Sequence, residues 1–260
     1  MRKMIPILGI CLALLALPLG CGKGTETPTV DTVIEINGEV GLSGAIELTE
    51  GHIENLVQCI EIMAMTGEVR SGNWENMSGI LSKFGQDEIL AATWFALPDG
   101  SCYTVEKGKV DKNISDRPYF PKVMAGNIVV GDLVVSRSTG RKAMVATVPV
   151  KNEGEVIGAL GVSVDLEKLS EIIVKELQLP DDMVFYAVND EGEIALHRNP
   201  ELLLIDTTGT GSETFANAVE YIRANREGTV AYEFNGVSEE VIFKTSSSID
   251  WHFALGFKGK

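Results

Sequence analysis

Residues 142–164 have the sequence KAMVATVPVKNEGEVIGALGVSV, in which two apolar runs flank a polar turn. The runs at 142–150 and 156–164 have the length and β-branched content of strands, and the second is nearly all apolar, as a central strand is. Asn-Glu-Gly at 152–154 is typical of a tight turn, because glycine accepts a positive φ. A turn this short joins antiparallel neighbours. The stretch therefore predicts the middle of an antiparallel sheet.

The segments on either side of this hairpin extend the sheet and add helices. The patterns predict strands at 89–97, 102–106 and 129–136, with turns at Pro98-Asp99-Gly100 and Ser138-Thr139-Gly140. They predict helices at 44–65, 74–84 with Asn73 as N-cap, 117–125 closed by Gly126, and 166–177 stopped by Pro180, with a polar loop at 107–116. Because tight turns join most of the strands, we expect an antiparallel sheet with helices on one side, not a doubly wound fold.

The C-terminal part of the chain repeats this order. The patterns predict strands at 183–188, 193–197, 229–234, 237–245 and 251–257, and a helix at 213–225 that Gly228 ends. Asn235-Gly236 is a strong hairpin signal between two of these strands. Residues 95–100 and 186–192 both combine a strand with an acidic-glycine turn, which indicates two copies of one module. The sequence thus predicts an α+β chain with a module boundary near Leu179-Pro180.

The N-terminus has the pattern of an export signal. Basic residues at Met1-Arg2-Lys3 precede an apolar run at 4–19, and Gly20-Cys21 follows it. The apolar run is shorter than the roughly 20 residues that a membrane-spanning helix needs, and prolines interrupt it. We expect residues 1–20 to be a cleaved signal peptide and the rest of the chain to work outside the cytoplasm.

The end of this signal, Leu17-Pro18-Leu19-Gly20-Cys21, resembles the lipobox of bacterial lipoproteins, with Pro18 in a place where that family usually has an aliphatic residue. The resemblance implies that lipid is attached to Cys21 and holds the protein on the membrane. Residues 21–43 are then the lipidated cysteine and a tether, whose first part is rich in Gly, Lys, Thr, Glu and Pro.

Two cysteines follow Cys21 in the predicted mature chain, because Cys11 lies inside the signal peptide. Outside the cytoplasm, Cys59 and Cys102 can form a disulfide. They can equally be two buried thiols that pack as small hydrophobic side chains. The sequence leaves both alternatives open, and neither cysteine lies in a metal-binding spacing.

Charge and motifs exclude several classes of function. A formal net charge of -15 argues against a nucleic-acid partner and against an electrostatic attraction to anionic lipid. His52, His197 and His252 are far apart in sequence, and the chain has no HExxH, no GxSxG and no phosphate-binding loop. We therefore predict no catalytic residue, no metal, no cofactor and no enzymatic activity. His197 ends a predicted strand, where it either lines a minor pocket or lies at the surface, and the sequence favours the surface.

Several segments together resemble the double Cache sensor domain, a PAS-like extracytoplasmic fold. The match rests on Asp116-Arg117-Pro118-Tyr119-Phe120, Ser136, residues 138–140, ATVPV at 146–150 and GALGVSVDL at 158–166. It covers the chain from about Gly44 to Lys260. The resemblance implies a long N-terminal helix beside two stacked modules, each an antiparallel sheet with flanking helices. Residues 44–179 would form the helix and the membrane-distal module, which usually holds the ligand, and residues 180–260 the membrane-proximal module.

The family also implies a ligand pocket between the central sheet and the segment around Arg117. An arginine that opens a short helix and is followed by Tyr119 and Phe120 provides a carboxylate clamp with an apolar wall. Trp94 would add to this wall, and Ser136 and Arg137 lie on the strand that follows. The structural alternative is that Arg117 ties down its own loop and that the aromatic side chains belong to the core.

One departure from the family concerns the ligand. Its amino-acid-binding members carry an aspartate in the late strand for the ammonium group of the ligand, and Ser163 stands at the aligned position. Asp165 is two residues further on and faces the same side, at the end of the strand. The remaining residues therefore fit a small carboxylate without an ammonium group better than an amino acid.

These features predict a ligand-binding lipoprotein that senses a small organic acid. In relatives, a transmembrane helix and an output domain usually follow the sensor, whereas this sequence ends at Lys260, so we expect the signal to pass to a separate partner. The partners expected are a sensor kinase, a chemoreceptor or a permease. The alternatives are a solute-capture protein for a transporter, a hydrolase with an unrecognised site, and a module that binds no ligand and serves in interactions.

Overall fold

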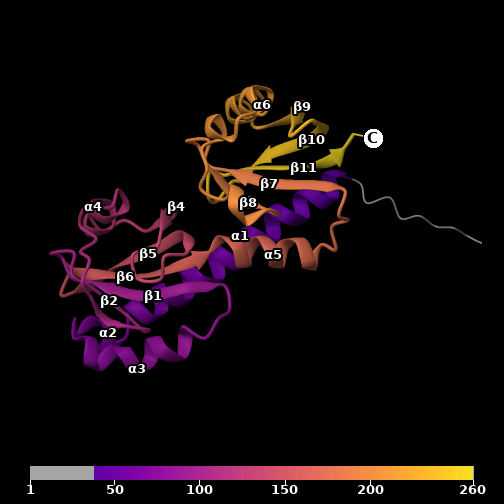
Figure 1. Ribbon diagram of the computed structural model, residues 1–260. Helices are drawn as coiled ribbons and strands as arrows, with labels where there is room; N and C mark the ends of the chain where they lie inside the picture. Colours follow the sequence, from indigo (N-terminus) through magenta and orange to yellow (C-terminus); the bar gives the residue numbers. More distant parts are fainter. Residues whose placement is uncertain (1–37, 260) are drawn as a thin grey trace, which may run out of the picture. The chain divides into compact units, whose positions relative to one another are not determined.

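The computed structural model describes residues 38–259, which form two antiparallel sheets (Figure 1). The predicted signal peptide, Cys11, the lipidation site Cys21 and the tether up to residue 37 lie outside the described residues and stay predictions. Among residues 38–259, no helix is both long and apolar enough to cross a membrane.

The first sheet is built around the hairpin of residues 142–164. Strand β5 (Lys142–Asn152) pairs antiparallel with β6 (Glu155–Asp165), and positive φ angles at Glu153 and Gly154 make the turn. The other strands are β1 (Leu90–Ala96), β2 (Cys102–Thr104), β3 (Gly108–Val110) and β4 (Val129–Val135). Their order is β3-β2-β1-β6-β5-β4. The predicted antiparallel sheet is confirmed, except that β3 lies in a stretch predicted as loop.

Helices cover both faces of this sheet. They are α1 (Gly38–Ala64), α2 (Gly67–Arg70), α3 (Trp74–Phe84), which the Asn73 side chain caps as predicted, and α4 (Tyr119–Met124). α1 and α3 pack on the face that contains Phe95 and Leu160, whereas α4 packs on the face that contains Trp94 and Val145. The prediction of helices on one side is therefore wrong for this sheet. Its central strands turn apolar side chains to both faces, so both faces must be covered.

The second sheet repeats the strand order of the first. Its strands are β7 (Met183–Val188), β8 (Ile194–His197), β9 (Glu227–Phe234), β10 (Val237–Thr245) and β11 (His252–Lys258). The order β8-β7-β11-β10-β9 corresponds to β2-β1-β6-β5-β4. The helices are α5 (Leu166–Glu176), η1 (Pro200–Leu202), η2 (Thr207–Thr210) and α6 (Glu213–Ala224). Gly228 does not end α6 as predicted: Asn225 is already extended, and Gly228 lies within β9.

Helix α1 belongs to the core of both sheets. It begins at Gly38 rather than at residue 44, inside the stretch predicted as tether. Ile53 and Ile60 are buried in the main hydrophobic core, and α1 packs against β5 and β6 of the first sheet and against β10 and β11 of the second (Figure 1).

A buried carboxylate ties α1 to the second sheet. Glu50 lies in the middle of the helix and accepts hydrogen bonds from the Ser246 hydroxyl at 2.5 Å, the Ser247 amide at 3.1 Å and the Ser248 amide at 3.2 Å. These donors belong to the loop that joins β10 to β11. The contact joins residues that are almost 200 positions apart in sequence, so no local pattern predicts it.

The two cysteines of the described chain are free thiols. Cys59 is exposed on α1, whereas Cys102 is buried in β2, in the core on the opposite face of the first sheet. The disulfide alternative is therefore wrong, because the sheet separates the two side chains. The alternative of two buried thiols holds for Cys102 only.

Candidate functional site

A small cavity lies on the α4 face of the first sheet. Its floor is made by side chains of β1, β2, β3, β4 and β6. Its cover is made by residues 111–119, here called the lid segment, and by the β4–β5 turn. The cavity has a volume of about 30 Å³, whereas a single water needs at least about 10–15 Å³ on the same scale. In this conformation it therefore has room for only one or two waters.

The apolar wall of the cavity is the Trp94 ring. Trp94 pairs with Gly161 of β6, and a Cβ atom at Gly161 would overlap the indole. Glycine at this position therefore lets the ring lie against the strand. Tyr119, at the start of α4, places its ring centroid 6.1 Å from that of Trp94, and both side chains are buried. The two rings hold the lid segment against the sheet.

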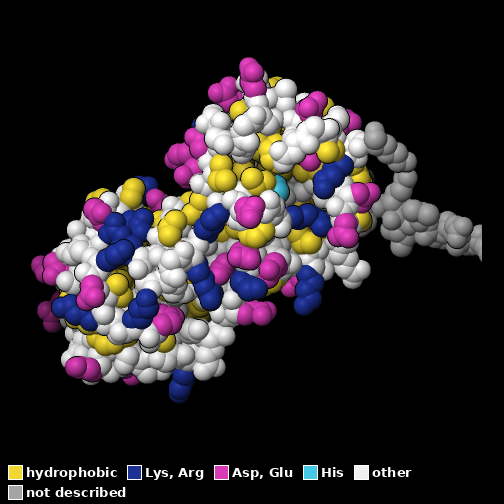
Figure 2. All heavy atoms as spheres, viewed as in Figure 1, with side chains coloured by type: hydrophobic (Ala, Val, Ile, Leu, Met, Phe, Trp, Pro, Cys, Tyr) yellow, Lys and Arg dark blue, Asp and Glu magenta, His cyan; other side chains and the backbone are white. Residues whose placement is uncertain are grey.

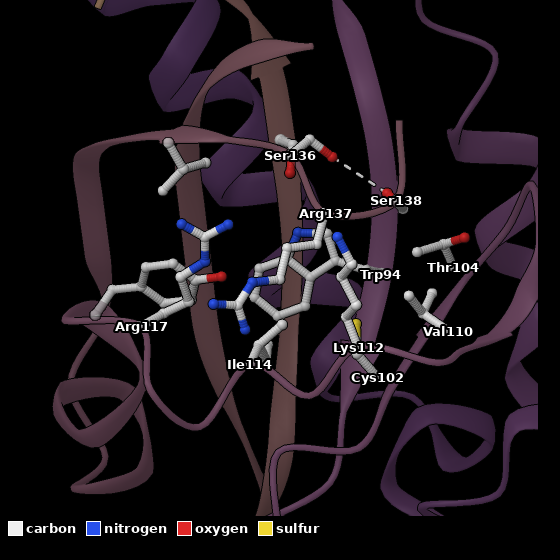
Figure 3. A pocket seen from close by; sticks show the side chains of 13 residues that line it. Trp94, Cys102, Thr104, Val110, Lys112, Ile114, Arg117, Ser136, Arg137 and Ser138 are labelled. Atoms are coloured by element: carbon white, nitrogen blue, oxygen red, sulfur yellow. Dashed lines mark hydrogen bonds between the residues drawn. The ribbon is translucent and has the colours of Figure 1, made fainter. Parts of the chain in front are cut away.

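Three cationic side chains converge on this wall. Figure 3 shows Arg117, Arg137 and Lys112 gathered around Trp94, and Figure 2 shows Lys and Arg side chains clustered over the part of the first module where α4 and β4 lie. The Arg117 guanidinium donates to the Val135 carbonyl at 2.8 Å, which ties the lid segment to β4. The site is thus locally basic on a chain whose net charge is -15.

Arg137 is held by a two-pronged ion pair. Its guanidinium donates to both carboxylate oxygens of Asp116, each at 2.7 Å, and also to the Asn113 carbonyl. Hydrogen bonding from Arg137 lowers the pKa of Asp116, and the same bond raises the pKa of Arg137. The pair clasps the β4–β5 turn to the lid segment over the cavity.

The remaining polar groups of the cavity are hydroxyls. Ser136 and Ser138 face each other at 3.2 Å (Figure 3), and Thr104 and Ser163 also line the cavity. None of the described residues that line it is acidic. Apart from the Asp116 carboxylate on the cover, which pairs with Arg137, the site offers only cations and hydroxyl donors, a combination that suits an anion.

Five of the seven predicted ligand residues line this cavity: Arg117, Tyr119, Trp94, Ser136 and Ser163. Phe120 is buried in the core beside it and does not line it. Asp165 is not part of the cavity either. Its carboxylate caps α5 by accepting from the amides of Glu167 and Lys168, and it pairs with Arg141 at 3.1 Å. The end of a strand is also the start of a helix here, and capping determines where this side chain points.

The sequence placed Arg137 beside Ser136 but did not predict it as a ligand residue, and Lys112, Ser138 and Thr104 were not predicted as ligand residues either. Lys112 lies in the predicted polar loop, where no periodicity shows the direction of a side chain. Arg137 is next to Ser136 in sequence and also lines the cavity. The direction of its side chain depends on the path of the β4–β5 turn, which the sequence pattern does not show.

Cys102 also lines the cavity, but its thiol is unreactive. Burial raises the pKa of its thiol to about 12, so the thiol stays protonated at neutral pH. Burial raises the pKa of Tyr119 as well. No three His, Cys, Asp or Glu side chains in residues 38–259 are arranged to hold a metal ion. The side chains that line the cavity suit the binding of an anion rather than a metal ion or covalent chemistry at Cys102.

The second module has a larger cavity, which His197 lines. The surface position that the sequence favoured for His197 is therefore wrong. Its Nδ1 accepts a hydrogen bond from the Asn199 amide at 2.8 Å, and burial lowers its pKa from the usual 6.5 to about 4.

The shifted pKa of His197 predicts a loss of stability in mild acid. Between pH 6.5 and 4 the unfolded chain binds a proton at His197 that the folded chain does not, so stability falls as the pH is lowered through this window. We expect the effect to reach roughly 2 kcal/mol after allowance for partial exposure. Urea unfolding of the native chain and of His197→Asn at several pH values measures it. The variant should show the shallower pH dependence, and equal slopes would contradict the prediction.

No protein-family model matches the chain, and no curated protein matches it. Solved structures do match. The ligand-binding domain of the Campylobacter jejuni chemoreceptor Tlp3, in complex with L-norvaline, has a TM-score of 0.63 at 15% identity, over 85% of this chain and 89% of that one. The ligand-binding domain of PctB, an amino-acid chemoreceptor of Pseudomonas aeruginosa PAO1, in complex with L-Arg, has a TM-score of 0.64 at 17% identity, over 85% of each chain.

A third example is the ligand-binding domain of the Pseudomonas fluorescens chemoreceptor CtaA, in complex with L-isoleucine. It has a TM-score of 0.62 at 14% identity, over 85% of this chain and 90% of that one. At these identities the likeness concerns the fold, which extends over both modules. The described chain therefore has the double Cache fold of extracytoplasmic sensor domains, as its sequence predicts.

Proposed function

We propose that this protein is an extracytoplasmic sensor that binds a small organic acid in the cavity of the first module. The observation that carries the proposal is the charge of the cavity: Lys112, Arg117 and Arg137 line it together with four serine and threonine hydroxyls, and no acidic side chain of the described residues does. Guanidinium groups bind carboxylates through paired hydrogen bonds, which makes a carboxylate the best-matched anion.

The same charges disfavour an amino acid in this cavity. An amino acid brings an ammonium group, which needs an anionic partner once it leaves water. Asp165 is already engaged by Arg141 and by the start of α5, and Ser163 offers only a hydroxyl. This contrasts with the three solved relatives above, whose structures contain amino acids.

Entry of a ligand requires the cover to move. A cavity of about 30 Å³ holds no organic acid as it stands. The Asp116–Arg137 clasp is the part that can open at least cost, because the Asp116 side chain is 67% exposed and an exposed ion pair contributes little stability. A ligand carboxylate would replace Asp116 as the partner of Arg137, so that binding and loop movement are coupled.

In this proposal the location rests on the N-terminal sequence, and the partners rest on the resemblance to sensor domains. A signal peptide at 1–20 and a lipid on Cys21 would hold the sensor on the outer side of the cell membrane. The partner that receives the signal would be a sensor kinase, a chemoreceptor or a permease. Labelling with a radioactive fatty acid, compared with Cys21→Ser, tests the anchor.

Titration calorimetry with acetate, propionate, lactate and succinate tests the binding proposal. We expect at least one acid to bind and Arg117→Ala to weaken it by about tenfold, which corresponds to ~1.4 kcal/mol. Arg117→Lys, which keeps the charge without the paired donors, should fall between the two. Arg141→Ala is the matched control, because Arg141 pairs with Asp165 outside the cavity. No binding by any acid, or equal affinity in Arg117→Ala, would contradict the proposal.

A further inference from the structure

The cavity of the second module has the size of a ligand site. It has a volume of about 390 Å³, within the ~300–1,000 Å³ that is typical of small-molecule pockets. It lies between the ends of β7 and β8, the segment 198–202 and the β9–β10 hairpin. Val184, Leu202, Phe234 and Val237 give it an apolar lining.

A buried carboxylate lines this cavity. Glu239 of β10 is only 6% exposed, and burial raises its pKa. Among the described residues, no cationic group lies within 4.0 Å of its carboxylate. The Tyr232 hydroxyl on the neighbouring strand and the charge of Lys258 lower the pKa of Glu239, but burial outweighs both. A carboxylate taken out of water without a close cation is costly, and a cationic ligand would offset that cost.

Donors for an anion lie close to this carboxylate. Lys258 of β11 is the direct cross-strand partner of Glu239 and is exposed at the rim. Because the Asn199 amide occupies Nδ1 of His197, the neutral ring carries its proton on Nε2. That N–H has no partner among the described residues. Arg198, by contrast, already donates to the carbonyls of Leu179 and Pro180.

We propose that this cavity binds an α-amino acid with an apolar side chain. Its ammonium group would pair with Glu239, its carboxylate with Lys258 and the His197 Nε2–H, and its side chain would pack against Val184, Leu202 and Phe234. An α-amino acid carries its two charges on one carbon, and adjacent cross-strand residues supply the two opposite charges at that spacing. No acidic side chain lines the first cavity, whereas Glu239 lines this one, so the two modules would bind different ligands.

Calorimetry on the full chain tests the proposal, with the common L-amino acids as the panel and L-leucine as the reference probe. We expect an apolar amino acid to bind, and 4-methylpentanoate and 3-methylbutylamine, which each lack one charged group, to bind at least tenfold more weakly than L-leucine. Glu239→Gln, which keeps the shape of the side chain, should weaken amino-acid binding at least tenfold. Lys258→Ala, at the exposed rim, should weaken it without affecting folding.

Arg117→Ala separates this proposal from that for the first cavity. It should leave amino-acid binding unchanged, just as Glu239→Gln should leave organic-acid binding unchanged. The proposal is overturned if no amino acid of the panel binds, if Glu239→Gln binds as tightly as the native chain, or if Arg117→Ala rather than Glu239→Gln abolishes amino-acid binding.

Discussion

Replacement of Glu50 by alanine is expected to lower the free energy of unfolding by about 2–3 kcal/mol, because it leaves a buried donor unsatisfied, which costs roughly 1–3 kcal/mol, and removes a second hydrogen bond. The Glu50 carboxylate accepts from the Ser246 hydroxyl and from the amides of Ser247 and Ser248, all within 3.2 Å. Alanine would leave the buried Ser246 hydroxyl and the Ser247 amide without their acceptor, whereas the Ser248 amide keeps the Ser246 hydroxyl oxygen at 3.2 Å. Urea denaturation followed by circular dichroism measures the change.

Glu54 provides the matched control, since it lies one turn further along α1. It makes a single hydrogen bond, from the Ser248 hydroxyl at 3.2 Å, and this bond is exposed. Glu54→Ala should therefore change stability by less than about 0.5 kcal/mol. Similar losses for Glu50→Ala and Glu54→Ala would mean that the loss reflects helix charge rather than the buried contact.

The second large effect is expected at Gly256 of β11. A Cβ atom there would overlap the Glu240 carbonyl oxygen and lie 2.6 Å from the Cα atom of Val241. Both obstacles are backbone atoms of β10, so no side-chain rotation relieves them, and the two strands must separate locally. We expect Gly256→Ala to cost about 3 kcal/mol or more, at the upper end for overpacked sites.

Gly79→Ala is the control for this substitution. Gly79 lies in α3 at an exposed position, and a Cβ atom there would meet nothing within 4 Å. Alanine in a helix interior is more favourable than glycine by roughly 0.5–1 kcal/mol, so this variant should be slightly more stable than the native chain. A Gly256→Ala variant with native stability would show that β10 and β11 tolerate a wider spacing.

Sequence patterns predicted the helices, strands and turns well because these elements depend mainly on residues that are close in sequence. The hairpin of β5 and β6 follows from two apolar runs and a glycine turn, and its strands extend only one or two residues beyond the predicted ends. The pairing of β1 with β6 joins residues about 70 positions apart, and no sequence pattern predicted it. The helices over both faces were missed because a wholly apolar strand does not show which face each helix covers.

Prediction of the site was limited in the same way, because sequence patterns do not show contacts between residues that are far apart in sequence. The resemblance singled out Arg117, Tyr119 and Ser163, and all three line the cavity. Strand alternation put Asp165 on the same face as Ser163, but a helix begins at that residue and uses its carboxylate as a cap. Lys112 and Arg137 lie on irregular segments, whose paths depend on contacts such as the Asp116–Arg137 pair that form only in the folded chain.

The shared helix α1 has a consequence for how this chain can be divided. The boundary near residues 179–180 looks like a place to cut, yet a fragment that begins there would lack the helix that packs on β10 and β11. Its sheet would expose that face and the donors that Glu50 satisfies. We therefore expect that residues 180–260 do not fold on their own. The two sheets share α1 and should unfold together in a single cooperative transition.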